Sequence, residues 1–84
     1  MSKSKDMVFY DYLMEWRGHH VSIFWDGGAS SGALTKKVLK NGDEYWQVKW
    51  KEGWFQFQLH SIKDMDFTSK RITCSQLGIY DKLP

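Results

Sequence analysis

The alternation of large apolar and polar side chains between residues 44 and 59 constrains the fold more than any other feature of the sequence. Large apolar residues occupy every second position in two groups, which the sequence Lys51-Glu52-Gly53 separates. The groups are Trp46, Val48 and Trp50, followed by Phe55, Phe57 and Leu59. Because successive side chains of a β-strand point to opposite faces, this period predicts two amphipathic strands joined by a tight turn.

A segment near the N-terminus has helical spacing instead. Phe9, Leu13 and Trp16 stand at positions i, i+4 and i+7, which predicts a short helix over about residues 6–16. Asp6 suits the first turn of this helix, and Gly18 tolerates the positive φ that often follows a helix end. We therefore expect the helix to end before Gly18.

Turn sequences divide most of the remaining chain into further strands. "HVSIFW" alternates and is followed by Asp26-Gly27-Gly28, and a long, bent second strand then leads to the hairpin dipeptide Asn41-Gly42. A fifth short strand is expected around residues 63–67. The last residues, 68–84, show no sustained period, so they are expected either to add a strand or to pack outside the barrel.

A helix followed by five short strands predicts a mainly β fold. A small five-stranded SH3-like barrel with a short N-terminal α-helix fits best, because closing the sheet removes the exposed edges of its strands. We expect a single domain over residues 1–84, with the helix at about 6–16, the barrel at 19–67 and a C-terminal tail at 68–84. The side chains predicted to form the core are Phe9, Leu13, Trp16, Val21, Ile23, Trp25, Leu34, Val38, Trp46, Val48, Trp50, Phe55, Phe57, Leu59, Ile62 and Met65.

Two stretches are similar to motifs of a known family. "YLMEWRGHHVSIFWDGGASSGALTKKV" resembles the first motif of Sm-like proteins, the family that includes Hfq, and "QLHSI" resembles the second motif of Hfq, with His60 and Ile62 at matching positions. Leu59 stands where Hfq has a lysine, and the Arg-Gly pair of the second Sm motif is missing. The resemblance covers about residues 9–67. It implies an Sm-like barrel, a ring-shaped homo-oligomer and single-stranded RNA bound near His60.

The alternation also places aromatic rings on the outward faces of the two strands. Tyr45 and Trp54 are expected there, beside Lys49 and close to Lys51. Rings among cations suit a nucleic-acid ligand, because bases stack on aromatic side chains and lysine holds phosphate. The alternative is that these rings pack under the C-terminal tail or against another subunit.

Further lysines belong to the same hypothesis. Lys36, Lys37 and Lys40 would join Lys49 and Lys51 in one basic face if the second and third strands pair around Asn41-Gly42. The formal net charge is only +2, so any anion site must be local. The alternative is an ordinary solvated strand face.

Other chemistry has little support in the sequence. His19 and His20 would point to opposite faces of a strand, so no metal site is expected. Ser30 and Cys74 lack a recognisable base partner, so we expect neither catalytic residues nor a cofactor. The single cysteine favours a reducing cytoplasm, and no apolar run is long enough to cross a membrane.

Taken together, these features predict a non-catalytic cytoplasmic binding protein of Sm-like type. It would bind single-stranded RNA or a nucleotide through Lys36, Lys37, Tyr45, Lys49, Lys51, Trp54 and His60. One alternative is a protein-interaction module, for example a phage-encoded inhibitor of host defence or of host enzymes. Another is a structural subunit of a larger assembly. A homo-oligomer is expected in each case, because open barrel edges of this fold pair between subunits.

Overall fold

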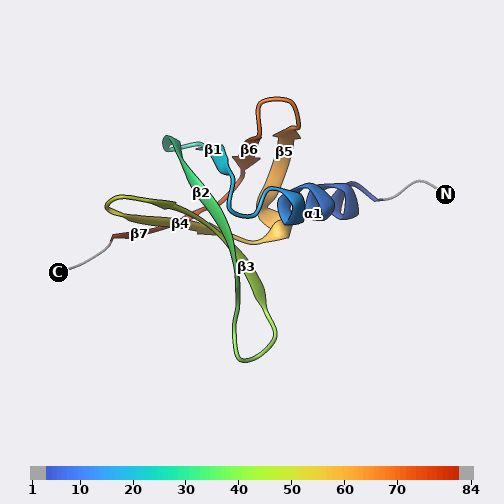
Figure 1. The fold of residues 1–84 in the computed structure, drawn as a ribbon, viewed down its shortest axis with the longest axis horizontal. Helices are drawn as coiled ribbons and strands as arrows, with labels where there is room; N and C mark the ends of the chain where they lie inside the picture. The colour runs from blue at the N-terminus through green and yellow to red at the C-terminus, as the bar shows by residue number, and fades with distance from the viewer. Residues whose placement is uncertain (1–3, 82–84) are drawn as a thin grey trace.

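The chain enters the fold through helix α1 (Lys5–Glu15), as the computed structural model of the protein shows for residues 4–81 (Figure 1). The Ser4 hydroxyl accepts a hydrogen bond from the Met7 backbone N–H at 3.3 Å and so caps the first turn. After Trp16 the backbone turns at Gly18, where φ is +82°. The predicted helix is thus confirmed, with each end one residue earlier than expected.

Within residues 4–81, seven strands and one short 3₁₀ helix follow α1. They are β1 (His20–Trp25), β2 (Gly28–Val38), β3 (Glu44–Trp50), β4 (Gly53–Phe57), η1 (Leu59–Ser61), β5 (Ile62–Asp66), β6 (Arg71–Cys74) and β7 (Gly78–Asp81). The strands form one sheet in the order β5-β6-β1-β2-β3-β4-β7. All neighbours are antiparallel except β1 and β6, which are parallel. Within residues 4–81, no helix combines the length and the apolar character needed to cross a membrane.

The sheet confirms a mainly β fold with an N-terminal helix, but it differs from the predicted closed five-stranded barrel. It is an open mixed sheet of seven strands, with β5 and β7 at its two edges. The two additional strands, β6 and β7, come from the segment predicted to be a tail. Each is four residues long, which is too short to display a recognisable period. The residues beyond Asp81 lie outside the described part of the chain.

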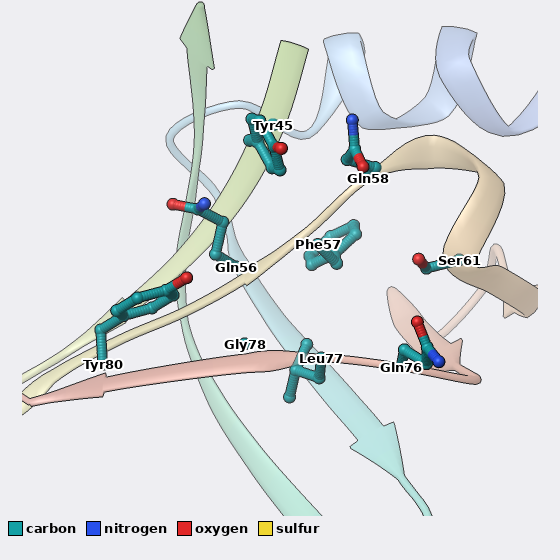
Figure 2. Close-up of a pocket in the computed structure, with 9 residues that line it drawn as sticks. All are labelled: Tyr45, Gln56, Phe57, Gln58, Ser61, Gln76, Leu77, Gly78 and Tyr80. Carbon is teal, nitrogen blue, oxygen red and sulfur yellow. The ribbon is translucent and has the colours of Figure 1, made fainter. Parts of the chain in front are cut away.

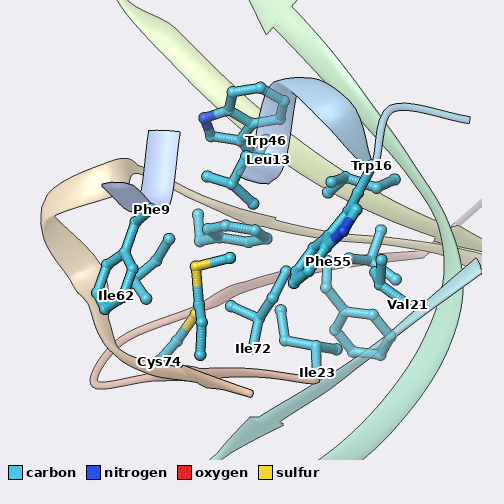
Figure 3. Packing of buried hydrophobic residues seen from close by; sticks show 14 residues of the cluster. Phe9, Leu13, Trp16, Val21, Ile23, Trp46, Phe55, Ile62, Ile72 and Cys74 are labelled. Carbon is cyan, nitrogen blue, oxygen red and sulfur yellow. The ribbon is translucent and has the colours of Figure 1, made fainter. Parts of the chain in front are cut away.

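The core lies between α1 and the inner face of the sheet (Figure 3). Most of the predicted core residues are buried, and the completely buried ones include Leu13, Ile23 and Val48. Val38 is the clearest exception, because it pairs with Glu44 near the tip of the β2–β3 hairpin and is 55% exposed. Three other predicted core residues are only partly buried and pack against the core from its margin: Trp25, Trp50 and Leu59.

Strand β6 supplies two core residues that the sequence pattern did not reveal. Ile72 and Cys74 are both fully buried, in the strand that lies between β5 and β1. Burial raises the pKa of the Cys74 thiol to about 12. At neutral pH this side chain is therefore a protonated, apolar component of the core and not a reactive thiolate.

At Gly32, the backbone of β2 lies very close to the backbone of β3. A Cβ atom at this position would overlap the backbone carbonyl oxygen of Lys49 on β3 and would lie 3.3 Å from a methyl group of Val48. The glycine at this position therefore has a steric cause, since only glycine lets β2 and β3 pair here without a shift of the backbone.

We expect Gly32→Ala to destabilise the protein by about 2 kcal/mol or more, as overpacking against a backbone atom does. Urea unfolding followed by tryptophan fluorescence measures this change. The matched control is Ser31→Ala at the adjacent exposed position, which should change the free energy of unfolding by less than about 0.5 kcal/mol. Equal stability of the two variants would contradict the close approach of β2 and β3.

Candidate ligand-binding groove

The outer face of β2, β3, β4 and β7 carries the residues of interest in two cross-strand rows. In the first row, Lys49 of β3 pairs with Trp54 of β4, and Trp54 pairs with Tyr80 of β7. In the second row, Gln47 pairs with Gln56. The Gln47 side chain donates a hydrogen bond from Nε2 to Oε1 of Gln56 at 2.9 Å. Both rows lie opposite the buried side chains, as the alternation predicts.

Trp54 does not stand free on this face. Its ring stacks on Tyr80, with centroids 5.4 Å apart and an interplanar angle of 12°. The Tyr80 side chain is 43% exposed, while Trp54 is only partly exposed. The interpretation that an outer ring packs against the C-terminal segment therefore holds for Trp54, and Tyr80 takes the exposed place in the stack.

Beside this stack lies an open groove of about 500 Å³ (Figure 2). Its polar lining consists of Tyr45, Gln56, Gln58, Ser61, Gln76 and Tyr80, and the remaining lining consists of Phe57, Leu77 and Gly78. The volume falls within the range usual for small-molecule sites. None of these nine residues is charged, so the groove suits a neutral polar group and not an anion.

The Tyr80 ring leans over Gly78 on the same strand. A Cβ atom at position 78 would lie 2.8 Å from Cε2 and 3.2 Å from the hydroxyl oxygen of Tyr80. The absence of a side chain at Gly78 thus creates the space that the ring occupies. Trp54 on one side and Gly78 beneath it together determine where the ring lies.

Two of the predicted lysines lie on the outer face near the groove. Lys37 of β2 is the cross-strand partner of Tyr45, and Lys49 of β3 is the partner of Trp54. Both lysines are exposed. They flank the aromatic residues without lining the groove, so positive charge is available at its border and absent from its interior.

Lys36 points to the opposite face of β2 from Lys37. Its Nζ atom donates a hydrogen bond to the Tyr10 hydroxyl at 3.0 Å and forms an ion pair with Glu44 at 3.2 Å. These two hydrogen bonds, from Lys36 to Tyr10 and to Glu44, raise the pKa of Lys36 above its ordinary value. The structure therefore does not bring Lys36 together with the other predicted site residues, because it connects β2 to α1.

The other two predicted residues lie at the margins. Lys51 is exposed in the turn between β3 and β4, and it does not line the groove. His60 lies in η1, and its Nε2 atom is 3.0 Å from Oε1 of the groove residue Gln58. His60 thus contacts a lining residue without lining the groove itself.

Of the nine groove residues, only Tyr45 had a functional prediction. The other eight are Gln56, Phe57, Gln58, Ser61, Gln76, Leu77, Gly78 and Tyr80. The outward position of Gln56 follows from the alternation, so its exposure was predictable. Nothing in the sequence indicated that residues 76–80 would lie beside β4, because that pairing joins segments more than 20 positions apart. Among residues 4–81, no group of three or more His, Cys, Asp or Glu side chains is arranged to hold a metal ion.

Comparison with known proteins adds no family to this description. No protein-family model, no curated protein and no solved structure matches the chain. The helix followed by a mixed sheet agrees with the coarse outline of the Sm-like resemblance, and no match confirms that family. The function of the groove is therefore inferred from its geometry.

The adjacent lysines of β2 offer a test of this geometry. We expect Lys36→Met to lower the urea midpoint, because it removes the hydrogen bond to Tyr10 and the ion pair with Glu44. Because the folded state raises the Lys36 pKa, this stabilisation persists through neutral pH and is lost only as the pH rises past the ordinary value of 10.5.

Lys37→Met is the matched control, since Lys37 is exposed on the other face. It should leave the urea midpoint unchanged at every pH. A stability loss in the Lys37 variant and none in the Lys36 variant would reverse the assignment of the two faces.

Proposed function

We propose that this protein is a non-catalytic binding protein that holds single-stranded RNA or a nucleotide on the outer face of β2, β3, β4 and β7. The observation that supports this proposal is the groove of about 500 Å³, with two tyrosines and three glutamines in its lining and two lysines at its border. A second cavity, beside α1, is lined by Asp6, Met7, Tyr10, Asp11 and Leu59, and its lining has neither an amide side chain nor a cation.

The aromatic residues supply a surface for stacking. A base gains about 1 to 3 kcal/mol when it stacks on an aromatic side chain, and every base has a π-face. Tyr80 offers an exposed ring whose position Trp54 supports, and Tyr45 contributes a second ring on the same face. A base in the groove would therefore find both a stacking partner and neutral hydrogen-bonding groups.

The lysines supply attraction for the phosphate groups. Lys37 is the cross-strand partner of Tyr45, and Lys49 is the partner of Trp54, and neither lysine lines the neutral groove. This separation suits a nucleotide, in which a neutral base and a charged phosphate are several bonds apart. Lys51 lies farther along the same hairpin and would contact the backbone of a longer strand.

The proposal predicts that single-stranded RNA quenches the tryptophan fluorescence of the protein, to which Trp54 contributes, in a titration with poly-U or poly-A at low salt. Affinity should fall as salt rises, because lysine–phosphate contacts release counterions. The double variant Lys37→Met/Lys49→Met should bind more weakly and show a shallower dependence on salt. Lys36→Met should retain the wild-type dependence on salt, since Lys36 faces α1.

The absence of any response to either polymer at low salt would rule out the proposed function. If the double variant kept the wild-type salt dependence, RNA would bind elsewhere on the protein and not on this face. Circular dichroism of each variant checks that the fold is retained.

A protein partner is the second candidate, and the free edge of the sheet favours it. Strand β7 is an edge strand, and Ile79 on it is 56% exposed. Exposed edges of this kind accept a further strand from another chain. In this case the partner would contact Ile79, on the face of β7 opposite to Tyr80.

We expect Ile79→Lys to abolish such an interaction and to leave RNA binding intact. Native mass spectrometry after nuclease treatment measures the change, because it reports the protein alone, its homo-oligomers and its complexes separately. Complexes that persist in the Ile79→Lys variant would exclude the β7 edge as their interface.

A further inference from the structure

The hydrogen bonds that two glutamines of the groove make within the protein determine which of their amide atoms a ligand would meet. The Oε1 atom of Gln56 accepts the hydrogen bond from Gln47, at 2.9 Å. The Oε1 atom of Gln58 is 3.0 Å from His60 Nε2 and accepts from it when the ring carries its proton there. Each of these oxygens then has one hydrogen bond within the protein, whereas the NH₂ groups of Gln56 and Gln58 have none to the residues that the structure describes. These NH₂ groups are therefore open donors for a ligand.

The groove also has one stacking surface of defined position. Tyr80 stacks on Trp54 at an interplanar angle of 12°, and its ring fills the space above Gly78. A planar ligand group placed on Tyr80 would therefore lie in the groove that Gln56 of β4 and Gln58, just after β4, also line (Figure 2).

We propose that the groove takes one unpaired base that bears a ring carbonyl, such as uracil or hypoxanthine, stacked on Tyr80 with its carbonyl oxygen toward the NH₂ groups of Gln56 and Gln58. This inference rests on the proposed function and adds selectivity to it. Adenine has no carbonyl group, so it offers these donors only its ring nitrogens, and its exocyclic amine would itself be a donor facing the NH₂ groups. We therefore expect adenine to bind in the groove more weakly than a base with a carbonyl group, whereas the lysines bind any sequence.

The chemistry of the lining argues for the base and against the phosphate. The lining contains no cation, so a phosphate placed in the groove would gain no ion pair there. Lys37 and Lys49 remain outside the groove to receive the phosphates. The distribution of charge therefore favours the neutral base in the groove and the phosphates beside the lysines.

The test uses five-nucleotide RNA strands in which only the central residue carries a base and the others are abasic. Hypoxanthine, uracil, adenine and no base are compared at the central position by fluorescence titration of the wild-type protein. We expect the two carbonyl-bearing strands to bind about two- to tenfold more tightly than the adenine strand, the range of one neutral hydrogen bond. Hypoxanthine and adenine make the sharpest pair, because they share the purine ring and differ only at the exocyclic atom on C6 and in the proton on N1.

Three variants locate this selectivity. Gln56→Glu retains the acceptor for Gln47 and removes the NH₂ donors, so the preference for hypoxanthine over adenine should disappear or reverse. The added negative charge weakens the binding of both strands equally, so the ratio of their two dissociation constants is compared. Gly78→Ala should displace the Tyr80 ring and weaken every strand with a base toward the abasic value. Ile79→Ala is the matched control on the opposite face of β7 and should change nothing.

The possible outcomes separate the two proposals. Salt-dependent binding of all four strands with equal affinity would overturn the inference and leave the proposed function in place. A preference for hypoxanthine that survives Gln56→Glu would also overturn it. Failure of all four strands, and of poly-U and poly-A, to bind would overturn both proposals.

Discussion

The burial of one face of β3 and β4 is the constraint on which the rest of the structure depends. Trp46, Val48, Phe55 and Phe57 are each at most 5% exposed, and together with α1 they form the centre of the core. A shift of one residue in the pairing would move all of these side chains into water. The register that buries them therefore also determines which residues of both strands face outward.

The C-terminal strands complete what the two central strands begin. β6 lies between β5 and β1 and contributes Ile72 and Cys74 to the core, so it belongs to the stable interior of the sheet. β7 contributes little to the core, and its Tyr80 instead stacks on Trp54 at the outer face. The same short segment of sequence thus divides into one strand that stabilises the fold and one that builds the wall of the groove.

Two neighbouring lysines of β2 lie on opposite faces of the sheet, and only one of them contacts α1. Lys36 and Lys37 are neighbours in sequence, yet the pleat of β2 directs Lys36 toward Tyr10 of α1 and Lys37 toward the outer face. The sequence hypothesis combined both lysines in one basic face, and the structure allows this only for Lys37. A cluster of charges along one strand is therefore a poor guide to a surface until the faces are known.

The sequence by itself determined the helix, the two central strands and the outward position of Tyr45, Lys49, Trp54 and Gln56, because these features follow from local spacing and turn chemistry. Only the tertiary structure decided that the sheet is open with seven strands, and that residues 76–80 meet Tyr45 across β4 to form a groove. The physical reason is that a four-residue strand carries no period of its own. Its place is selected by the strand edge that remains unpaired, and that edge exists only when the rest of the sheet has formed.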